Sequence, residues 1–291
     1  MAIAEPYVAP PPRRSLRPRV PAPTFLTRVP GASYVAFAAV GTVVAVTIFG
    51  GVLSPYPPDI PAALPLSAPS SAHWFGTDEI GRDVLSRVLV GVRSSWWGGL
   101  GVILSGVVIG GLIGLAAGAA GRIVDSILMR ITDLFLAIPG AVLAVAVVGA
   151  LGPSYFHTLF AVSIVWWPLY ARVVRGEITR LKASPHIEAA RVAGSSRMAI
   201  AFRHLLPGAV PPTIICATQD VGGVILTLAG LSFIGLGQPQ PAPELGSMSQ
   251  QGLTFLFNAW WIPILPAVAV AMLVLVANFA GDAVRELLSD R

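Results

Sequence analysis

Charged residues are scarce in this sequence: Asp, Glu, Lys and Arg make up 11% of the 291 residues, whereas 55% of the residues are hydrophobic. The mean hydropathy is +0.76. Soluble domains carry about 25% charged residues, so a chain of this length could not hide its apolar surface in a soluble globule. The composition excludes a soluble protein and indicates a chain that lies in a lipid bilayer.

Cysteine, lysine and histidine are also rare, and each shortage removes a class of function. The one cysteine, Cys216, excludes an internal disulfide and is predicted to be a buried, inert thiol. The one lysine, Lys182, follows Arg-Leu, so the chain contains no glycine-rich phosphate loop ending in Gly-Lys-Ser or Gly-Lys-Thr. The four histidines lack paired metal-ligand spacing, and no Ser/His/Asp set shares one membrane depth. We therefore predict no metal site and no catalytic residues, which disfavours an intramembrane protease or transferase.

Long runs without charge are what the sequence has instead. Crossing about 30 Å of hydrocarbon takes roughly 20 residues of helix, and six segments reach or approach that length: 34–53, 94–121, 134–156, 157–171, 205 to beyond 236, and 259–281. The fourth is short unless it begins near Tyr155. We expect an all-α fold with six transmembrane helices, forming one membrane domain over residues 33–291. Residues 1–32, rich in Pro and Arg, are predicted to be a disordered cytoplasmic tail.

The distribution of basic residues predicts the orientation of these spans. Cytoplasmic loops retain Lys and Arg, and with the N-terminus inside, 16 of the 19 basic residues fall in the tails and the loops 122–133 and 172–204. Only Arg82, Arg87 and Arg93 then lie outside. The pI of about 10 is accounted for by topology and gives no support for binding nucleic acid. Both termini are expected in the cytoplasm.

The segment 73–93, before the second span, is predicted to be an amphipathic helix at the outer interface. Its apolar residues recur at helical spacing from Ile80 to Val92. Thr77 is a candidate N-cap, with acidic residues in the first turn, and Asp83 stands four residues before Arg87. The charged residues of this predicted outer helix are Asp78, Arg82, Asp83 and Arg87. It either anchors the next span, or forms a surface that helps gate the outer mouth or meets a delivery protein.

The second span carries glycine at every fourth position, from Gly106 through Gly110 and Gly114 to Gly118. Small residues at this period let two helix backbones approach closely in a membrane. The stripe predicts a tight helix contact, either within this chain or at a subunit interface.

Asp220 is the one acid well inside a predicted span. A charge at the bilayer centre costs about 2.5–3.5 kcal/mol on insertion scales, so this side chain should face the protein interior or water. Asp220, Gln219 and Thr227 are candidate pathway residues. Asp220 could contact the substrate or fasten a neighbouring helix, and the sequence leaves both open. Pro139 and the pair Pro211-Pro212 indicate bent helices around such a pathway.

A helical hairpin is predicted over residues 184–207, between the fourth and fifth spans. Ser184 and Pro185 are typical of an N-cap and a first helical position, and Gly194 is typical of the left-handed residue that follows a helix end. A DNA-binding helix-turn-helix is disfavoured, because both ends enter the membrane within a few residues.

The second helix of the hairpin is predicted to begin after Ser195 or Ser196 and to end before Pro207. The first presents a face of small residues, Ala189 and Ala190 beside Glu188. A small face suits insertion into the cleft of a partner, and a rigid hairpin can transmit a rotation to the spans at either end.

These residues carry a resemblance to a known family. The loop containing Glu188, Ala189, Ala190, Gly194, Leu206 and Pro207 resembles the EAA motif of bacterial permeases of ATP-binding-cassette (ABC) importers. Segments 73–93, 231–248 and 279–291 narrow the resemblance to the second permease subunit of dipeptide and oligopeptide importers, from about residue 33 to the end. The resemblance implies a type I importer fold in the bacterial inner membrane, with the hairpin as the element that couples the ATPase subunits to transport.

The resemblance also implies partners: a homologous second permease, two cytoplasmic ATPases that bind ATP and Mg²⁺, and an extracytoplasmic peptide-binding protein. No cofactor is expected in this chain. Related permeases move nickel, glutathione or other small solutes, so these remain alternative substrates. A secondary transporter is a weaker alternative, because it would be expected to place several ionisable groups in its spans, and only Asp220 qualifies.

Overall fold

The computed structural model describes residues 30–289, with side chains described from Tyr34 to Leu288, and within this range the chain is helical and has no β-strand. The predicted tail therefore lies outside the described residues except for residues 30–32, where the first helix begins. The α-helices are α1 (Pro30–Leu53), α2 (Val84–Ala120), α3 (Arg122–Ala137), α4 (Gly140–Leu151), α5 (Tyr155–Lys182), α6 (Pro185–Val192), α7 (Arg197–Ile200), α8 (Leu206–Phe233), α9 (Leu245–Gly252) and α10 (Trp261–Ser289).

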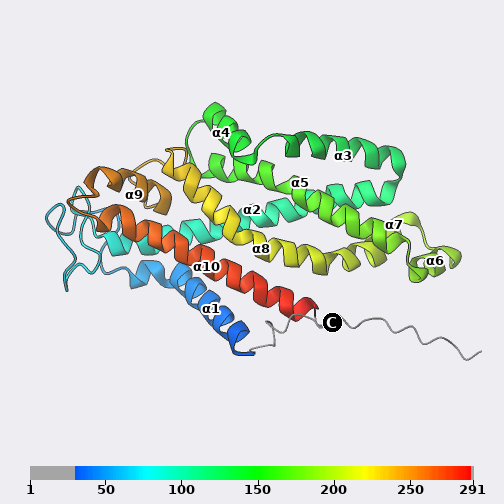
Figure 1. Cartoon of the computed structure of the whole chain (residues 1–291), viewed down its shortest axis with the longest axis horizontal. Coiled ribbons are helices and arrows are strands. Elements are labelled where there is room, and N and C mark those ends of the chain that lie inside the picture. The colour runs from blue at the N-terminus through cyan, green and yellow to red at the C-terminus, as the bar shows by residue number, and fades with distance from the viewer. Residues whose placement is uncertain (1–29, 290–291) are drawn as a thin grey trace, which may run out of the picture.

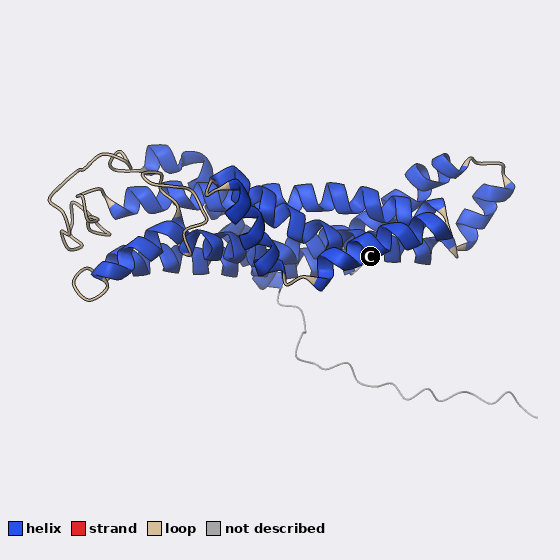
Figure 2. Cartoon of the chain, turned by 90° about the horizontal axis from the view of Figure 1, so that it is seen from above, coloured by secondary structure: helices blue, strands red, loops and turns tan. Residues whose placement is uncertain are grey.

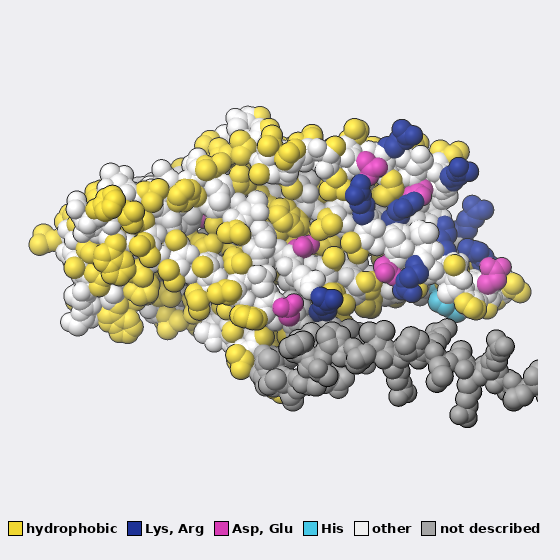
Figure 3. Space-filling model, viewed as in Figure 1, with side chains coloured by type: hydrophobic (Ala, Val, Ile, Leu, Met, Phe, Trp, Pro, Cys, Tyr) yellow, Lys and Arg dark blue, Asp and Glu magenta, His cyan; other side chains and the backbone are white. Residues whose placement is uncertain are grey.

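The long helices run side by side along an elongated bundle (Figures 1 and 2). The short helices α6 and α7 close one end, and α9 lies with the loop 54–83 at the other (Figure 1). Lys and Arg side chains gather toward the α6–α7 end, whereas the opposite half of the same face is largely hydrophobic (Figure 3). The bundle thus has one basic end and one end built of loops, which are the candidates for its two membrane surfaces.

Within residues 30–289, four helical segments are long and apolar enough to cross a membrane: Tyr34–Leu53, Val84–Ala120, Arg197–Phe233 and Trp261–Leu288. The pair α3–α4 makes a fifth if its two bent halves form one span. The helix α5 has 28 residues but is not apolar enough to meet the same requirement. Part of α5 packs inside the bundle: Ala161, Val162, Tyr170 and Ile178 are fully buried, so neighbouring helices rather than lipid surround these positions. Phe156 and Phe160 of the same helix are exposed. Six spans were expected, and four or five are found on length and composition alone.

The expected third span, 134–156, is not one straight helix. α3 begins much earlier, at Arg122, and meets α4 at a bend of 86°. Pro139 stands at this bend as the residue before α4, and its backbone is not helical (φ −54°, ψ 123°). Proline cannot donate a backbone hydrogen bond, and its ring clashes with the carbonyl of the preceding helical turn. The helix therefore breaks at Pro139, where the sequence predicted a bend. α5, which corresponds to the expected fourth span, begins at Tyr155, the start that the sequence required for sufficient length.

The glycine stripe of α2 packs against α5 within the chain. A Cβ on Gly110 would lie 2.3 Å from the carbonyl oxygen of Trp167, and one on Gly114 would lie 2.5 Å from that of Ala171. Only glycine allows backbones this close. The stripe therefore forms an intramolecular contact, and this contact holds the two helices together over three turns.

The prediction of a separate interfacial helix over residues 73–93 is wrong. α2 begins at Val84 and continues through the second span without interruption, and its N-cap is Asp83 rather than Thr77. Thr77 instead forms an isolated β-bridge with Asp83. The reason is Gly81, whose φ of +88° cannot belong to a right-handed helix and whose Cβ position lies 2.2 Å from the carbonyl oxygen of Ala63. Ile80 is accordingly an exposed residue of a turn.

The α2–α5 contact predicts a contrast between two adjacent glycines. Gly110→Ala should destabilise the chain by about 1–3 kcal/mol, because the added methyl group collides with backbone that cannot move away. Gly111→Ala is the matched control, since no atom lies within 4 Å of its Cβ position, and it should be neutral or slightly stabilising. Thermal unfolding of the two purified variants in detergent checks this. Equal stability of the two would contradict the packing described.

Candidate coupling hairpin and membrane-embedded polar pair

The predicted hairpin is present and its turn is closed by backbone hydrogen bonds. α6 follows Ser184, with Pro185 in its first turn. At its end, the N–H of Gly194 donates to the carbonyl of Arg191 (2.9 Å) and the N–H of Ser195 donates to that of Ala190 (3.1 Å). Gly194 has φ +82°, and this pair of bonds around a left-handed residue is the Schellman arrangement. The glycine stop predicted from sequence is confirmed.

The second arm begins where one of the two serines was predicted to cap it. The hydroxyl of Ser196 accepts from the N–H of Ala199 (3.2 Å), and α7 follows. The prediction that this arm ends before Pro207 is wrong, because the chain continues through a π-helical turn, Ala201–Leu205, into α8. The wider turn accommodates Pro207, which lacks an N–H and would crowd a regular α-helical carbonyl. The hairpin is thus joined to α8 without a loop.

The hairpin is fastened to the bundle by its own small hydrophobic cluster. Ile187 of α6 is fully buried and packs with Ile200 and Leu205 of the second arm and with Ile178 of α5. Leu115 of α2 completes the set from the third side. Ala190 and Leu206 pack against this cluster and are partly buried. A displacement of the hairpin therefore acts on the ends of α2, α5 and α8 together.

The outward face of the hairpin is apolar at its tip. Val192 is 84% exposed and Met198 is 68% exposed. Glu188, also exposed, pairs with Arg191 (3.2 Å) on the same helix. Ala189 faces outward, unlike Ala190. Exposed apolar residues rimmed by charge are typical of a protein interaction site. Sequence reasoning missed Val192 and Met198, because nothing in their spacing distinguishes them from core residues.

Asp220 meets a partner that sequence reasoning also missed. Its carboxylate on α8 accepts a hydrogen bond from the hydroxyl of Tyr170 on α5 (2.9 Å). The tyrosine is fully buried and Asp220 is partly buried. This hydrogen bond pairs two polar side chains that would each be costly if left without a partner in hydrocarbon. No sequence signal joins the two residues, which are 50 positions apart.

The two other pathway candidates are not part of this pair. The hydroxyl of Thr227 donates to the carbonyl of Gly223 in its own helix (2.8 Å). Gln219 is partly buried and lies where α8 packs closely on α10. The approach is close, since a Cβ added to Gly281 of α10 would lie 3.0 Å from the Cα of Gln219. The structure thus brings Asp220 together with α5 and leaves Gln219 and Thr227 as separate candidates on α8.

At the opposite end, the four charged residues predicted on an outer helix are all buried. Asp78 accepts from the guanidinium of Arg82 (2.6 Å), and Asp83 accepts from the N–H and the hydroxyl of Ser86. His73 lies 2.9 Å from Asp83, so the predicted Asp83–Arg87 pairing is not found. These contacts fold the loop back onto the start of α2.

Arg87 fastens this loop to the other side of the molecule. It is 2% exposed and donates to the carbonyl oxygens of Pro58 (2.9 Å) and Pro241 (3.2 Å). The indole N–H of Trp261 also donates to the carbonyl oxygen of Thr77 (3.1 Å). The segment expected to be a solvated interfacial helix is therefore buried at the loop end of the bundle. We call the contacts of Arg87 with Pro58 and Pro241 the Arg87 clasp.

With this geometry in view, comparison with known proteins identifies the family. Residues 110–291 match the family described as binding-protein-dependent transport system inner membrane components. The chain belongs to this family. It is thus a multi-pass membrane component of a transport system, not an enzyme. The resemblance inferred from the hairpin residues is confirmed.

Relatives of this permease extend the match toward the N-terminus. It is 41% identical to the probable D,D-dipeptide transport system permease protein of Escherichia coli (strain K12), over 79% of each chain. It is 41% identical to a glutathione transport system permease protein of Pectobacterium atrosepticum, over 77% of this chain and 74% of that one. A dipeptide transport system permease protein of Alkalihalophilus pseudofirmus is 38% identical, over 78% of this chain and 74% of that one.

A solved structure confirms the fold. An inward-facing structure of the MetNI methionine ABC transporter contains a chain that matches this permease with a TM-score of 0.56 and 22% sequence identity. The match covers 69% of this chain and 96% of the other. The expected type I importer fold is supported at the level of the shared helical core.

The Asp220–Tyr170 pair predicts coupled effects of mutation. Tyr170→Phe and Asp220→Leu should each destabilise the chain, and the double variant should cost less than the sum of the two, by about 0.6–1.7 kcal/mol. Asp220→Asn is the matched control, because its amide oxygen can still accept from the tyrosine. A double-mutant cycle of thermal unfolding in detergent measures the coupling. Strict additivity would show that the bond contributes nothing.

Proposed function

We propose that this chain is the second permease subunit of an ATP-driven peptide importer of the bacterial inner membrane. The family and the names of the relatives support a peptide-like substrate, because dipeptides and glutathione share peptide bonds and charged termini. The observation that carries the proposal is the hairpin: its apolar tip is exposed, while its base is packed into the ends of three long helices.

The topology that goes with this function has six spans. α3 and α4 together form the third span and α5 forms the fourth, because its 28 residues are long enough to cross a bilayer and its fully buried positions contact neighbouring helices. Both termini and the hairpin lie in the cytoplasm. The basic end of the bundle supports this orientation, since Lys and Arg are retained on the cytoplasmic side.

The partners are a homologous second permease, two ATPase subunits and an extracytoplasmic peptide-binding protein. The ATPases bind ATP and Mg²⁺, because this chain has no phosphate-binding loop and needs no cofactor of its own. The binding protein delivers the peptide at the loop end, which the buried Arg87 clasp holds together.

The hairpin transmits the ATPase cycle to the spans. Closure of the ATPases on ATP displaces the tip, and the cluster around Ile187 passes this displacement to α2, α5 and α8. The Asp220–Tyr170 bond keeps α5 and α8 moving as one unit. The pathway then opens outward, and hydrolysis resets it. Such a cycle requires that the ATPase contacts differ in free energy between the two states.

Glutathione is the second candidate substrate, favoured by the relative at 41% identity that is named for it. Uptake of labelled glutathione and of labelled dipeptides by vesicles containing the assembled importer separates the two. The secondary-transporter alternative predicts uptake without ATP.

The orientation predicts a labelling pattern. In a chain with Cys216 replaced, a single cysteine at the exposed Ser71 should react with an impermeant maleimide in intact cells, and one at the exposed Ser196 should not. Permeabilising the cells should make the second position react, which controls for burial. Reaction of the Ser196 variant in intact cells would overturn the orientation and the docking of ATPases on the hairpin.

Coupling is tested by two substitutions on the hairpin. Gly194→Val forces a β-branched residue into the left-handed region, and Ala189→Trp adds bulk to the outward face that the ATPase must contact. Peptide uptake per ATP hydrolysed should fall roughly 5- to 150-fold, the range of typical coupling free energies. Gly194→Asn and Ala189→Ser are the matched controls and should retain most uptake.

Peptide uptake and ATP hydrolysis are measured in the same vesicles, with the importer fully assembled. A normal ratio of uptake to hydrolysis in Gly194→Val and Ala189→Trp would exclude the hairpin as the coupling element.

A further inference from the structure

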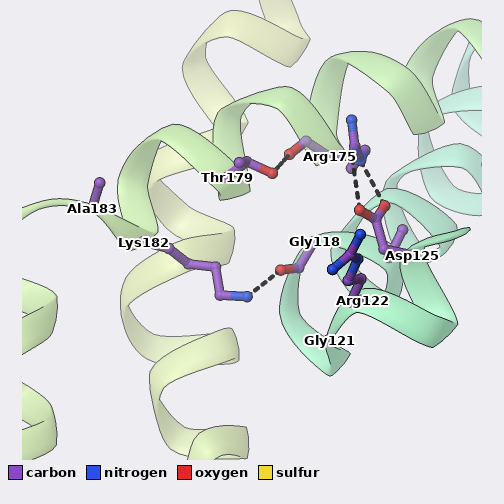
Figure 4. Close-up of a pocket in the computed structure, with 9 residues that line it drawn as sticks. Gly118, Gly121, Arg122, Asp125, Arg175, Thr179, Lys182 and Ala183 are labelled. Atoms are coloured by element: carbon purple, nitrogen blue, oxygen red, sulfur yellow. Dashed lines mark hydrogen bonds and ion pairs between the residues drawn. The ribbon is translucent and has the colours of Figure 1, made fainter.

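A cleft opens at the basic end of the bundle, where α2 ends and α3 begins beside the last turns of α5. Its volume is ≈ 410 Å³. A water molecule occupies about 30 Å³ of liquid, so the cleft has room for a phosphate with part of its glycerol. The side chains that line it from α3 and α5 are mostly charged (Figure 4).

The charges of this cleft are not balanced. Arg175 is neutralised by Asp125, through two hydrogen bonds of 2.6 and 2.7 Å. Lys182 donates to the carbonyl oxygen of Gly118 (2.5 Å), which satisfies a donor but leaves the positive charge in place. Arg122 has no carboxylate partner among the residues that the structure describes. Both uncompensated cations project into the space between the ends of α2, α3 and α5 (Figure 4).

The cleft lies at the depth of lipid head groups. The charge-free run of α2, residues 94–121, spans about 42 Å at a rise of 1.5 Å per residue. A bilayer with its head-group layers is about 40–45 Å thick. Arg93 and Arg122 flank this run, so they fall in opposite head-group layers. Given the proposed orientation, Arg122 and Lys182 lie in the cytoplasmic one.

An apolar face continues from the cleft toward the membrane interior. Along α3, Ile123, Ile127, Ile131 and Leu134 are 77%, 56%, 43% and 68% exposed. They are spaced by three or four residues and therefore form one stripe. Thr132 is the buried residue of this helix. A ligand with an anionic head and hydrocarbon chains matches both the cleft and the stripe.

We propose that the cleft binds the phosphate head group of an anionic phospholipid of the cytoplasmic leaflet, with the acyl chains on the exposed stripe of α3. Arg122 and Lys182 supply the charge, as in basic pockets between transmembrane helices that bind such lipids. Lys182 is the last residue of α5, two positions before the Ser184 cap of the hairpin. An occupied cleft therefore lies at the base of the coupling element. The leaflet assigned to it rests on the proposed orientation, whereas lipid binding does not.

The test uses the assembled importer in nanodiscs made from equimolar phosphatidylglycerol and phosphatidylcholine. The importer is extracted into mild detergent, and the lipids it retains are measured by native mass spectrometry. The wild type should retain phosphatidylglycerol in preference. Arg122→Gln and Lys182→Gln should each weaken retention roughly fivefold, and the double variant roughly 25-fold, because each basic residue at an anionic surface contributes about this much.

Two variants control for charge and structure. Arg180→Gln removes a cation from the same helix, but Arg180 pairs with Glu177 and does not line the cleft, so retention should be unchanged. Lys182→Arg keeps the charge and should keep the lipid. The glutamine at position 182 can still donate to Gly118, and thermal stability of each assembled variant confirms its fold.

Three results would overturn the proposal. One is equal retention of the two lipids by the wild type, and another is an equal loss in Arg180→Gln and in the double variant. The third is displacement of phosphatidylglycerol by millimolar inorganic phosphate, which would assign the cleft to a free anion. The readout is bound lipid, so a failure of peptide transport or of the Ser196 labelling pattern is scored separately.

Discussion

The close approach of α2 and α5 is the constraint on which the rest of the structure depends. Glycine at positions 106, 110, 114 and 118 lets the two backbones touch, and a side chain at Gly110 or Gly114 would collide with main-chain oxygen. In lipid there is no hydrophobic force to drive helices together, so this packing has to supply the association. It places Tyr170 where it can reach Asp220, and it brings Lys182 to the end of α2.

The two ends of the bundle use charge in opposite ways. At the loop end, Asp78, Arg82, Asp83 and Arg87 are buried and hydrogen-bonded, so removing one partner would leave an uncompensated buried charge. At the hairpin end, the Arg172–Asp133 and Arg180–Glu177 pairs are exposed and weak. The charges of the loop end are therefore part of its packing, whereas those of the hairpin end remain at the surface.

These features form a mechanical path through the permease. The hairpin rests on a separate hydrophobic cluster, distinct from the main core that joins α2, α5, α8 and α10. The continuous π turn into α8 and the direct connection from α5 leave no flexible loop to absorb a displacement. The polar pair between α5 and α8 then lies within the membrane portion of the same two helices. A push at the tip is therefore carried into the spans.

What the sequence determined by itself was local. Hydropathy located the four long apolar helical segments, because the requirement for about 20 apolar residues is a property of a continuous stretch of chain. Pro139 located the break between α3 and α4, and Gly194 located the hairpin turn, because each rests on the backbone preferences of a few neighbouring residues. The EAA-like loop was enough to identify the family.

Tertiary structure decided the rest. The outer segment was mistaken for a helix, because its helical spacing outweighed Gly81. The φ of Gly81 is +88°, and its carbonyl oxygen accepts from the N–H groups of Ala62 and Ala63 in the loop. Tyr170 as the partner of Asp220, the carbonyl oxygens that bind Arg87, and the cleft between Arg122 and Lys182 all join residues far apart in the chain. Periodicity and composition contain no information about such pairs, since it is the glycine-lined packing of α2 on α5 that brings them within reach.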